Sequence, residues 1–379
     1  MKSSSWIRAM FEEGEKMKKK HGPENILDFT LGNPIMEPPG ELKEELVKIA
    51  SSDLKGMHRY MTNSGYEFVR EEIGNYYKEK TKLPFSKDNI IMTVGAAGGI
   101  NVVLKALLDP DDEVLVLNPY FVEFMFYIGN HCGVMKLVDT KDDFHLDIDK
   151  IEKSITKKTK AIIINSPNNP TGVVYTGEEL KELAQILRKR HDKGQRIFLI
   201  ADEAYKKLIY DGTILPDVLN IYEDTVVVTC HSKDLGLAGE RIGHIAASPS
   251  IKNIKPLMDA MIFANRILGF INAPAIMQRL VAKFQHTSVD IMEYQRRRDA
   301  IYNILIEAGF DVIKPLGAFY IFPKTPVADD IQFVRELQKH HILGVPGIGF
   351  GKAGYFRLAY CVEIDVIERS RKYFMELGR

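Results

Sequence analysis

The stretch that decides the fold is VVVTCHSKDLGLAGERIG, residues 226–243. It begins as an apolar, β-branched run, which predicts a buried strand. A polar loop with three glycines follows, carrying Lys233 at its start and Arg241 near its end. Ligands of parallel α/β sheets bind beyond the carboxyl ends of the strands. Lys233 is therefore a candidate site residue, although a single loop lysine is most often a solvated surface charge.

Other apolar runs of strand length alternate with helical patterns before residue 270. The segment 177–194, GEELKELAQILRKRHDKG, has helical periodicity and a glycine stop. Strands separated by helices predict an α/β fold with a mostly parallel sheet covered on both faces. The runs are NIIMTVG (89–95), DEVLVLNP (112–119), AIIINSP (161–167), RIFLIADE (196–203), DTVVVTCHS (224–232) and RIGHIAAS (241–248).

The later part of the chain has a different pattern. A long polar helix is predicted in 286–310, followed by the short runs GAFYIFP and YFRLAYC with a helical stretch between them. We therefore expect a large domain over 46–270 and a smaller α+β domain over 271–379. The N-terminal segment, 1–45, is expected to pack with the small domain.

Composition excludes several classes of protein. The 379 residues are 45% hydrophobic and 27% charged, which is typical of a globular protein. Lys+Arg and Asp+Glu both number 51, so net charge indicates neither a nucleic-acid nor a membrane partner. Three cysteines without a C-x-x-C pair suit a reducing compartment and predict no metal site. With no secretory signal and no run long enough to span a membrane, we expect a cytoplasmic protein.

Three more loops follow predicted strands. NSPNNPTG (165–172) forms a rigid turn that can present amide groups, and ADEAY (201–205) places Asp202 at a strand end. VGAAGGI (94–100) joins a strand to a helix, whose free N–H groups can bind an anion. Each loop by itself can equally be an ordinary turn. Together with Lys233 and Arg241 they match pyridoxal phosphate, which has a phosphate, a pyridine nitrogen, an aldehyde and a phenolic oxygen.

At this point the sequence resembles the fold-type I pyridoxal-phosphate enzymes, in the class I/II aminotransferase family of the aspartate aminotransferase type. The resemblance implies a seven-stranded, mostly parallel sheet between helices plus a smaller domain. It covers nearly the whole chain, with motifs in the expected order. These are LGNP (31–34), YMTNSGYEFVR (60–70), VGAAGG (94–99), NPYF (118–121), NNPTG (168–172), DEAY (202–205), SKDLGLAGERIG (232–243), GAFYIF (317–322), VPGIGFG (345–351) and FRLAY (356–360).

The resemblance implies a role for each residue around the cofactor ring. Lys233 would hold the cofactor as a Schiff base and afterwards transfer a proton as a general acid–base. Asp202 would pair with the protonated pyridine nitrogen, which keeps the ring an electron sink. Asn169 and Tyr205 would hydrogen-bond the phenolic oxygen. Phe121 would stack on the ring, although it can also be an ordinary core phenylalanine.

The phosphate and the substrate have their own implied residues. The amides of Ala96 and Ala97, with Ser232 and Arg241, would bind the phosphate. Tyr60 would reach the phosphate of a neighbouring subunit, which implies a homodimer with active sites at the interface; it can also be a plain interface or core tyrosine. The resemblance implies three substrate-binding residues. Arg357 would clamp the α-carboxylate, Gly32 would let the backbone approach the substrate closely, and Asn169 would also contact it.

One position departs from the family pattern. The family usually has Ser-x-Ser-Lys before the anchoring lysine, whereas this chain has Cys-His-Ser-Lys, with Cys230 where a phosphate-binding serine is expected. A thiol is a weaker hydrogen-bond donor than a hydroxyl, so Cys230 either leaves that contact to its neighbours or is simply a buried cysteine. We expect His231, beside it, to be structural or solvent-facing.

The leading functional hypothesis is a transaminase. It would move an amino group between an L-amino acid and a 2-oxo acid, with 2-oxoglutarate as acceptor, by a ping-pong mechanism. The alternative is a carbon–sulfur β-lyase or a decarboxylase with the same cofactor; NNPTG and DEAY favour transaminases, because the lyases more often have a histidine in each motif. An aminotransferase-like transcription regulator is unlikely, since only about thirty residues precede LGNP.

The donor substrate is not determined by these motifs. No second arginine can be assigned to a side-chain carboxylate; Arg8 and Arg266 are candidates and no more. We therefore expect a broad or non-dicarboxylic donor range. Specificity should depend on the N-terminal segment, the loop 35–39 and residues of the second subunit.

Overall fold

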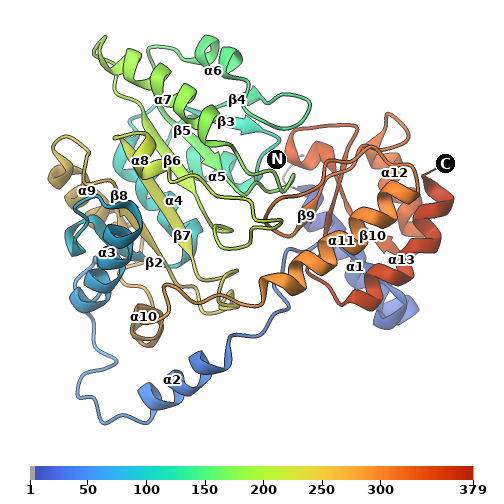
Figure 1. The fold of residues 1–379 in the computed structure, drawn as a ribbon, viewed down its shortest axis with the longest axis horizontal. Helices are drawn as coiled ribbons and strands as arrows, with labels where there is room; N and C mark the ends of the chain where they lie inside the picture. Colours follow the sequence, from blue (N-terminus) through green and yellow to red (C-terminus); the bar gives the residue numbers. More distant parts are fainter. Residues whose placement is uncertain (1–4, 379) are drawn as a thin grey trace.

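The computed structural model describes the backbone of residues 5–378, and the side chains of Met10 and residues 12–378. Figure 1 shows two groups of elements, a large sheet between helices and a smaller group of helices and short strands that contains the C-terminus. The helices are α1 (Ser5–His21), α2 (Gly40–Ala50), α3 (Glu67–Thr81), α4 (Gly95–Leu107), α5 (Glu123–Gly129), α6 (Ile148–Ser154), α7 (Gly177–His191), α8 (Val218–Ile221), α9 (Ile254–Ile267), α10 (Ala275–Ala282), α11 (Ile291–Glu307), α12 (Asp330–Lys339) and α13 (Ile364–Leu377).

The large sheet has seven strands, as expected. β8 runs antiparallel to both of its neighbours, and all other neighbouring pairs are parallel. The carboxyl ends of the other six strands therefore lie at one edge of the sheet. In spatial order the strands are β2 (Ile90–Thr93), β8 (Gly243–Ala247), β7 (Thr225–Cys230), β6 (Phe198–Asp202), β5 (Thr159–Asn165), β3 (Glu113–Asn118) and β4 (Val134–Asp139).

Both faces of this sheet are buried. Ile163 and Val226 point into a core formed with α4, α5 and α9, whereas Ile162 and Val227, their neighbours in the chain, point into a core on the opposite face. That second core includes residues of α2, α3, α7 and α10. Two-sided burial explains why these strands have continuous apolar runs instead of an alternating pattern.

The edge strand β4 was not among the apolar runs of the sequence. Its residues, VMKLVD, are mostly exposed or half-buried, and only Val138 is buried. It pairs with β3 in parallel from Val134 to Asp139. An edge strand has one neighbour and a solvated face, so its composition does not need to be apolar.

The smaller region combines both ends of the chain. β9 (Tyr320–Ile321), β11 (Val345–Pro346) and β12 (Phe356–Ala359) form an antiparallel sheet, and β1 (Leu27–Asp28) pairs in parallel with β10 (Ile342–Leu343). Phe29 and Leu27 belong to the same buried core as residues of α11, α12 and α13. Leu27 and Phe29 of the N-terminal segment therefore pack in this region, while the division of the chain into domains at residues 45 and 270 stays a prediction.

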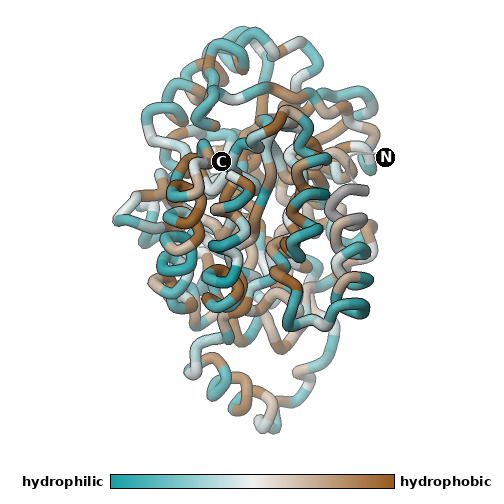
Figure 2. Tube along the Cα trace, turned by 90° about the vertical axis from the view of Figure 1, so that its right-hand side faces the viewer, coloured by the Kyte–Doolittle hydropathy of each residue, from teal (hydrophilic) through white to brown (hydrophobic). Residues whose placement is uncertain are grey.

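The helices of this smaller region are amphipathic. Figure 2, which views the molecule from their side, shows hydrophilic and hydrophobic stretches alternating along them. In α12, Phe333, Val334 and Leu337 are buried at helical spacing, and its other face is solvated. Among the described helices, none has the length and apolar content needed to cross a membrane.

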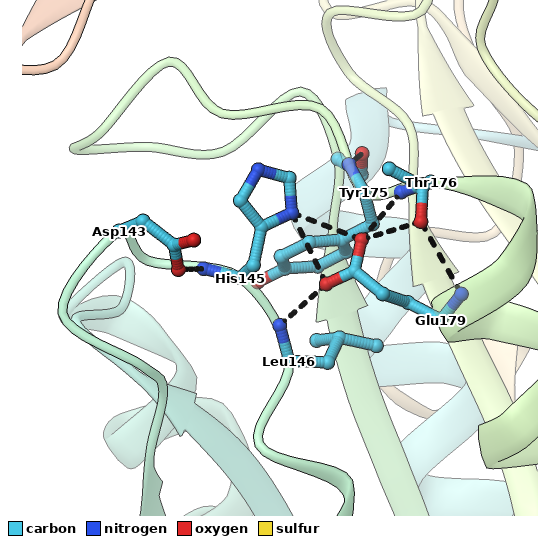
Figure 3. A network of polar contacts seen from close by, with 7 residues as sticks. Asp143, His145, Leu146, Tyr175, Thr176 and Glu179 are labelled. Carbon is cyan, nitrogen blue, oxygen red and sulfur yellow. Dashed lines mark hydrogen bonds and ion pairs between the residues drawn. The ribbon is translucent and has the colours of Figure 1, made fainter.

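A polar network fixes the start of α7 against the loop before α6 (Figure 3). Thr176 and Glu179 form a capping box, in which each side chain accepts from the other residue's backbone N–H. The Glu179 carboxylate also accepts from Leu146 N at 2.7 Å and contacts His145 Nδ1 at 2.9 Å. These hydrogen bonds lower the pKa of Glu179 to about 2 against the effect of burial, and they raise the pKa of His145. The network ties a long surface loop to the helix layer.

Candidate active site

A cavity of about 300 Å³ lies at the carboxyl ends of the large-sheet strands. Loops after β2, β3, β5, β6 and β7 contribute to its lining, together with the N-terminal segment and the small-domain strands β9 and β12. Nearly all of the expected site residues meet here. The lining is Leu31, Gly32, Ala96, Ala97, Ile100, Phe121, Glu123, Tyr127, Asn165, Asn169, Asp202, Ala204, Tyr205, Cys230, Ser232, Lys233, Arg241, Tyr320 and Arg357.

Lys233 reaches this cavity from the loop directly after β7. Its Nζ donates a hydrogen bond to Gly32 O at 3.1 Å and lies 5.3 Å from the Phe319 ring centre. No carboxylate among the described residues forms an ion pair with it. Burial lowers the pKa of Lys233, and the positive charges of Arg241 and Arg357 act in the same direction. The arrangement favours a neutral, nucleophilic amine.

Asp202 ends β6 and is buried in the cavity wall. Its Oδ1 accepts from Ala204 N at 3.3 Å, and its backbone oxygen accepts from Asn165 Nδ2 at 3.1 Å. Burial raises the pKa of Asp202 to about 7. Among the described residues no cationic side chain pairs with this carboxylate, so a cationic group of a bound molecule would be strongly stabilised there.

Arg357 comes from β12 and is held by several groups. Nη1 donates to Asn169 Oδ1 at 3.0 Å and Nη2 donates to Thr30 O at 2.6 Å. The guanidinium lies 4.5 Å from the Tyr320 ring centre and 4.6 Å from that of Phe350. Its buried Nε has no hydrogen-bond partner. Arg357 is thus a rigid planar donor facing the cavity, which suits a carboxylate ligand.

A second cationic group lies at the start of α4. Gly95 has a φ of +70°, and a Cβ there would come within 2.6 Å of Arg241 Nη2. The glycine therefore lets Arg241 approach the first turn of α4, beside Ala96 and Ala97. The N–H groups of a first helical turn have no acceptor within the helix. With Ser232 in the same lining, the cluster suits a phosphate.

The aromatic residues enclose the cavity. Tyr205 and Tyr320 are buried, with their hydroxyl oxygens 3.0 Å apart. Burial raises the pKa of Tyr320 to about 12 and that of Tyr205 further above its usual value, so both stay neutral. Phe121 follows β3 and contacts Phe124 edge to face. A Cβ on Gly32 would meet Tyr320 Oη at 1.9 Å, so the N-terminal segment can lie this close only with glycine there.

Four other residues named from the sequence need a separate account. Tyr60 lies outside this cavity and its side chain is 85% exposed. Arg266 is exposed on α9 and does not line the cavity, while the Arg8 side chain lies outside the described residues. His231 is buried, not solvent-facing, with Nδ1 3.3 Å from Asp234 Oδ2.

Cys230 is a free, buried cysteine in the cavity lining. Sequence reasoning did not single out Glu123, Tyr127 or Tyr320, which also line the cavity. Glu123 and Tyr127 follow the NPYF motif, and Tyr320 lies inside GAFYIF. Their nearness to these motifs was the available signal, but neither motif indicates which way a side chain points.

The residues present fit pyridoxal phosphate. The buried Asp202 without a cationic partner suits a protonated pyridine nitrogen, Lys233 with its lowered pKa suits an aldehyde, and the start of α4 with Arg241 suits a phosphate. These groups come from three different strand ends facing one cavity. The unused Nε of Arg357 offers a donor for a substrate carboxylate.

Comparison with known proteins agrees with this geometry. The family model of aminotransferase class I and II matches residues 24–372. A probable aspartate aminotransferase of Methanocaldococcus jannaschii is 34% identical, covering 90% of this chain and 92% of its own. An amino transferase structure from Eubacterium rectale is 34% identical with a TM-score of 0.95, covering 98% and 94%. The Thermus thermophilus aspartate aminotransferase solved with maleate is 27% identical with a TM-score of 0.88, covering 98% and 96%.

Proposed function

The chain belongs to the class I and II aminotransferases, which are pyridoxal-phosphate-dependent transaminases, and from that premise we propose the roles of its own residues. The observation that carries the proposal is the convergence of Lys233, Asp202 and Arg357 on one buried cavity. Lys233 is the residue that would hold the cofactor aldehyde covalently, Asp202 would bind the pyridine nitrogen, and Arg357 would bind the substrate α-carboxylate.

Pyridoxal phosphate, when bound, supplies an electrophilic aldehyde carbon and a conjugated ring that accepts the electron pair released at the substrate Cα. The chain supplies the rest. Lys233 Nζ, whose pKa is lowered by burial, would accept the Cα proton and return it to the cofactor side. Arg357, locked by Asn169 and Thr30, fixes the α-carboxylate so that Cα lies within reach of Nζ.

The surrounding groups orient the cofactor and exclude water. Asn169 and Tyr205 would bind its phenolic oxygen, and Phe121 would pack on its ring. Ala96, Ala97, Ser232 and Arg241 would hold its phosphate. Asn169 N donates to Asn165 Oδ1 at 2.7 Å, and Asn165 also bonds the Asp202 backbone, which couples the positions of these two cofactor-binding residues.

The reaction would follow a ping-pong course with 2-oxoglutarate as acceptor. One cavity would bind the donor amino acid and then the oxo acid through the same Arg357 contact. The maleate bound to the Thermus relative, a dicarboxylate, is consistent with carboxylate recognition in this family.

The enzyme would be a cytoplasmic homodimer. Tyr60 is 85% exposed on the single chain. Met61 N donates to Asn272 Oδ1 at 3.4 Å, so Tyr60 lies beside the segment that contains the exposed Ile271. Exposed apolar groups that lie together favour a protein interface. In the dimer, the Tyr60 hydroxyl would reach the phosphate of the neighbouring subunit.

Two measurements test the proposal. Purified enzyme with the cofactor should show a visible absorbance band that borohydride removes by reduction, leaving a covalent adduct on Lys233; Lys233→Ala should form none. An adduct retained in Lys233→Ala would refute the assignment. With amino-acid donors and 2-oxoglutarate, the product should be glutamate. Pyruvate and ammonia without glutamate would instead indicate a β-lyase.

A further inference from the structure

Glu123 is an acidic residue of the active-site cavity that the reaction does not use. It begins α5, just beyond the carboxyl end of β3, and its side chain lines the cavity. Its Oε2 is buried and has no hydrogen-bond partner. Burial raises the pKa of Glu123, and its own backbone N–H partly opposes this shift. A buried carboxylate oxygen without a partner is costly, which calls for a ligand or a function.

Contacts next to Glu123 place it on the substrate side of the cavity. Tyr120 N, three residues before Glu123, donates to Phe350 O at 3.1 Å, and the Phe350 ring centre lies 4.6 Å from the Arg357 guanidinium. The positive charge of Arg357 also opposes the rise in the pKa of Glu123 that burial causes. Glu123 is therefore associated with the Arg357 end of the cavity.

No hydrogen bond or ion pair joins Glu123 to Arg357 in the described structure. The Arg357 fork is already shared between Asn169 and Thr30. Glu123 is thus not the direct counter-ion that holds the arginine in place. The remaining cations of the cavity lining are Lys233 and Arg241, both assigned to the cofactor. In the described part of this chain, a distal group of the substrate would therefore meet one unpaired carboxylate and no free cation.

We propose that Glu123 determines donor specificity by selecting amino acids whose side chain ends in a cationic group and by disfavouring those with a distal carboxylate. The inference rests on the proposed function, because it needs Arg357 to take the α-carboxylate. An ammonium or guanidinium would then bind the unpaired Oε2, and a second carboxylate would be repelled. The same charge would make 2-oxoglutarate a less efficient acceptor than a neutral 2-oxo acid.

The first test measures binding to the enzyme with its cofactor, without turnover. Two analogues of equal chain length lack the reacting α-amine: 5-aminopentanoate has a distal ammonium and glutarate has a distal carboxylate. The wild type should bind 5-aminopentanoate more tightly. Glu123→Gln, which removes the charge at nearly constant shape, should reduce the ratio of their affinities about tenfold, equivalent to 1.4 kcal/mol. Glu182→Gln, an exposed change on α7, is the matched control.

The second test follows the donor half-reaction through the cofactor absorbance. In Glu123→Gln, the kcat/KM ratio of ornithine to norvaline should fall about tenfold and the ratio of glutamate to norvaline should rise. If Glu123→Gln changes these ratios less than twofold, or if the wild type prefers glutarate, the inference is overturned while transamination stands. If no donor gives transamination at all, the proposed function fails, and the binding ratio still decides whether Glu123 discriminates by charge.

Discussion

Replacing Asp202 with Asn tests the electrostatics of the site most directly. In the protein without its cofactor, the Asp202 carboxyl is buried and has no cationic partner among the described residues, and its pKa is raised from 3.8 to about 7. This difference corresponds to about 4 kcal/mol, because one pKa unit is 1.36 kcal/mol. The folded state binds more protons than the unfolded state between these two values. The protonated Asp202 carboxyl therefore contributes this free energy to the stability of the folded state in full below pH 3.8, and the contribution is lost as pH rises through 7.

The expected result is that Asp202→Asn becomes more stable relative to the wild type as pH rises. Between pH 5 and pH 8 the wild-type protein without cofactor should lose about 2.5 kcal/mol of unfolding free energy relative to Asp202→Asn, which has no charge to bury. Urea unfolding at both pH values measures this, with the exposed Asp142→Asn as control. A wild-type-to-variant difference that does not change with pH would refute the reasoning.

The same substitution should act in the opposite direction once the cofactor is present. A pyridinium nitrogen gives the carboxylate its missing partner, so breaking the pair should cost about 3–5 kcal/mol. Asp202→Asn should therefore bind the cofactor more weakly and transaminate more than a hundredfold more slowly. Stabilisation without cofactor combined with loss of function with it is a pattern that a merely structural aspartate would not produce.

Three further predictions follow from named contacts. Arg357→Lys keeps the charge but loses the planar fork, so kcat/KM for amino acids should fall about 10- to 100-fold, mainly through KM; an unchanged KM would contradict the carboxylate clamp. Tyr60→Phe should leave the fold intact, since the side chain is 85% exposed, and weaken cofactor binding about tenfold in a fluorescence titration; equal affinity would exclude a phosphate contact. Glu179→Gln should lower the free energy of unfolding by about 1–2 kcal/mol at pH 7. Because the Glu179 pKa is about 2, the greater stability of the wild type should vanish as pH falls from 4.5 towards 2; a stability difference in chemical denaturation that does not change with pH would contradict this.

Much of the fold was predictable because its signals are local. The β7 run and the loop after it placed Lys233 at a strand end, and the parallel arrangement then brought Asp202 and Asn169 to the same edge. β4 escaped prediction because an edge strand needs no apolar run. The antiparallel direction of β8 was likewise not predicted, because strand direction is set by the connection and not by the strand's own composition.

The candidate site was predictable only in part, for a related reason. Gly32, Lys233, Asp202 and Arg357 lie inside recognisable motifs, and all four line one cavity. Glu123 carries no signal of its own in the sequence, since an acid in the first turn of a helix is ordinary. That its Oε2 is buried without a partner depends on the packing around it.

The sequence by itself indicated six of the seven strands of the large sheet, the chemistry of the loops that follow them and Lys233 as the candidate anchoring lysine. Only the tertiary structure decided which groups meet. Asn169 and Arg357 are 188 residues apart in the chain, yet 3.0 Å apart in the cavity. Such contacts depend on how the small domain packs against the sheet, and so does the desolvation that shifts the Asp202 and Lys233 pKa values. Burial is a property of the whole fold, and no local pattern contains it.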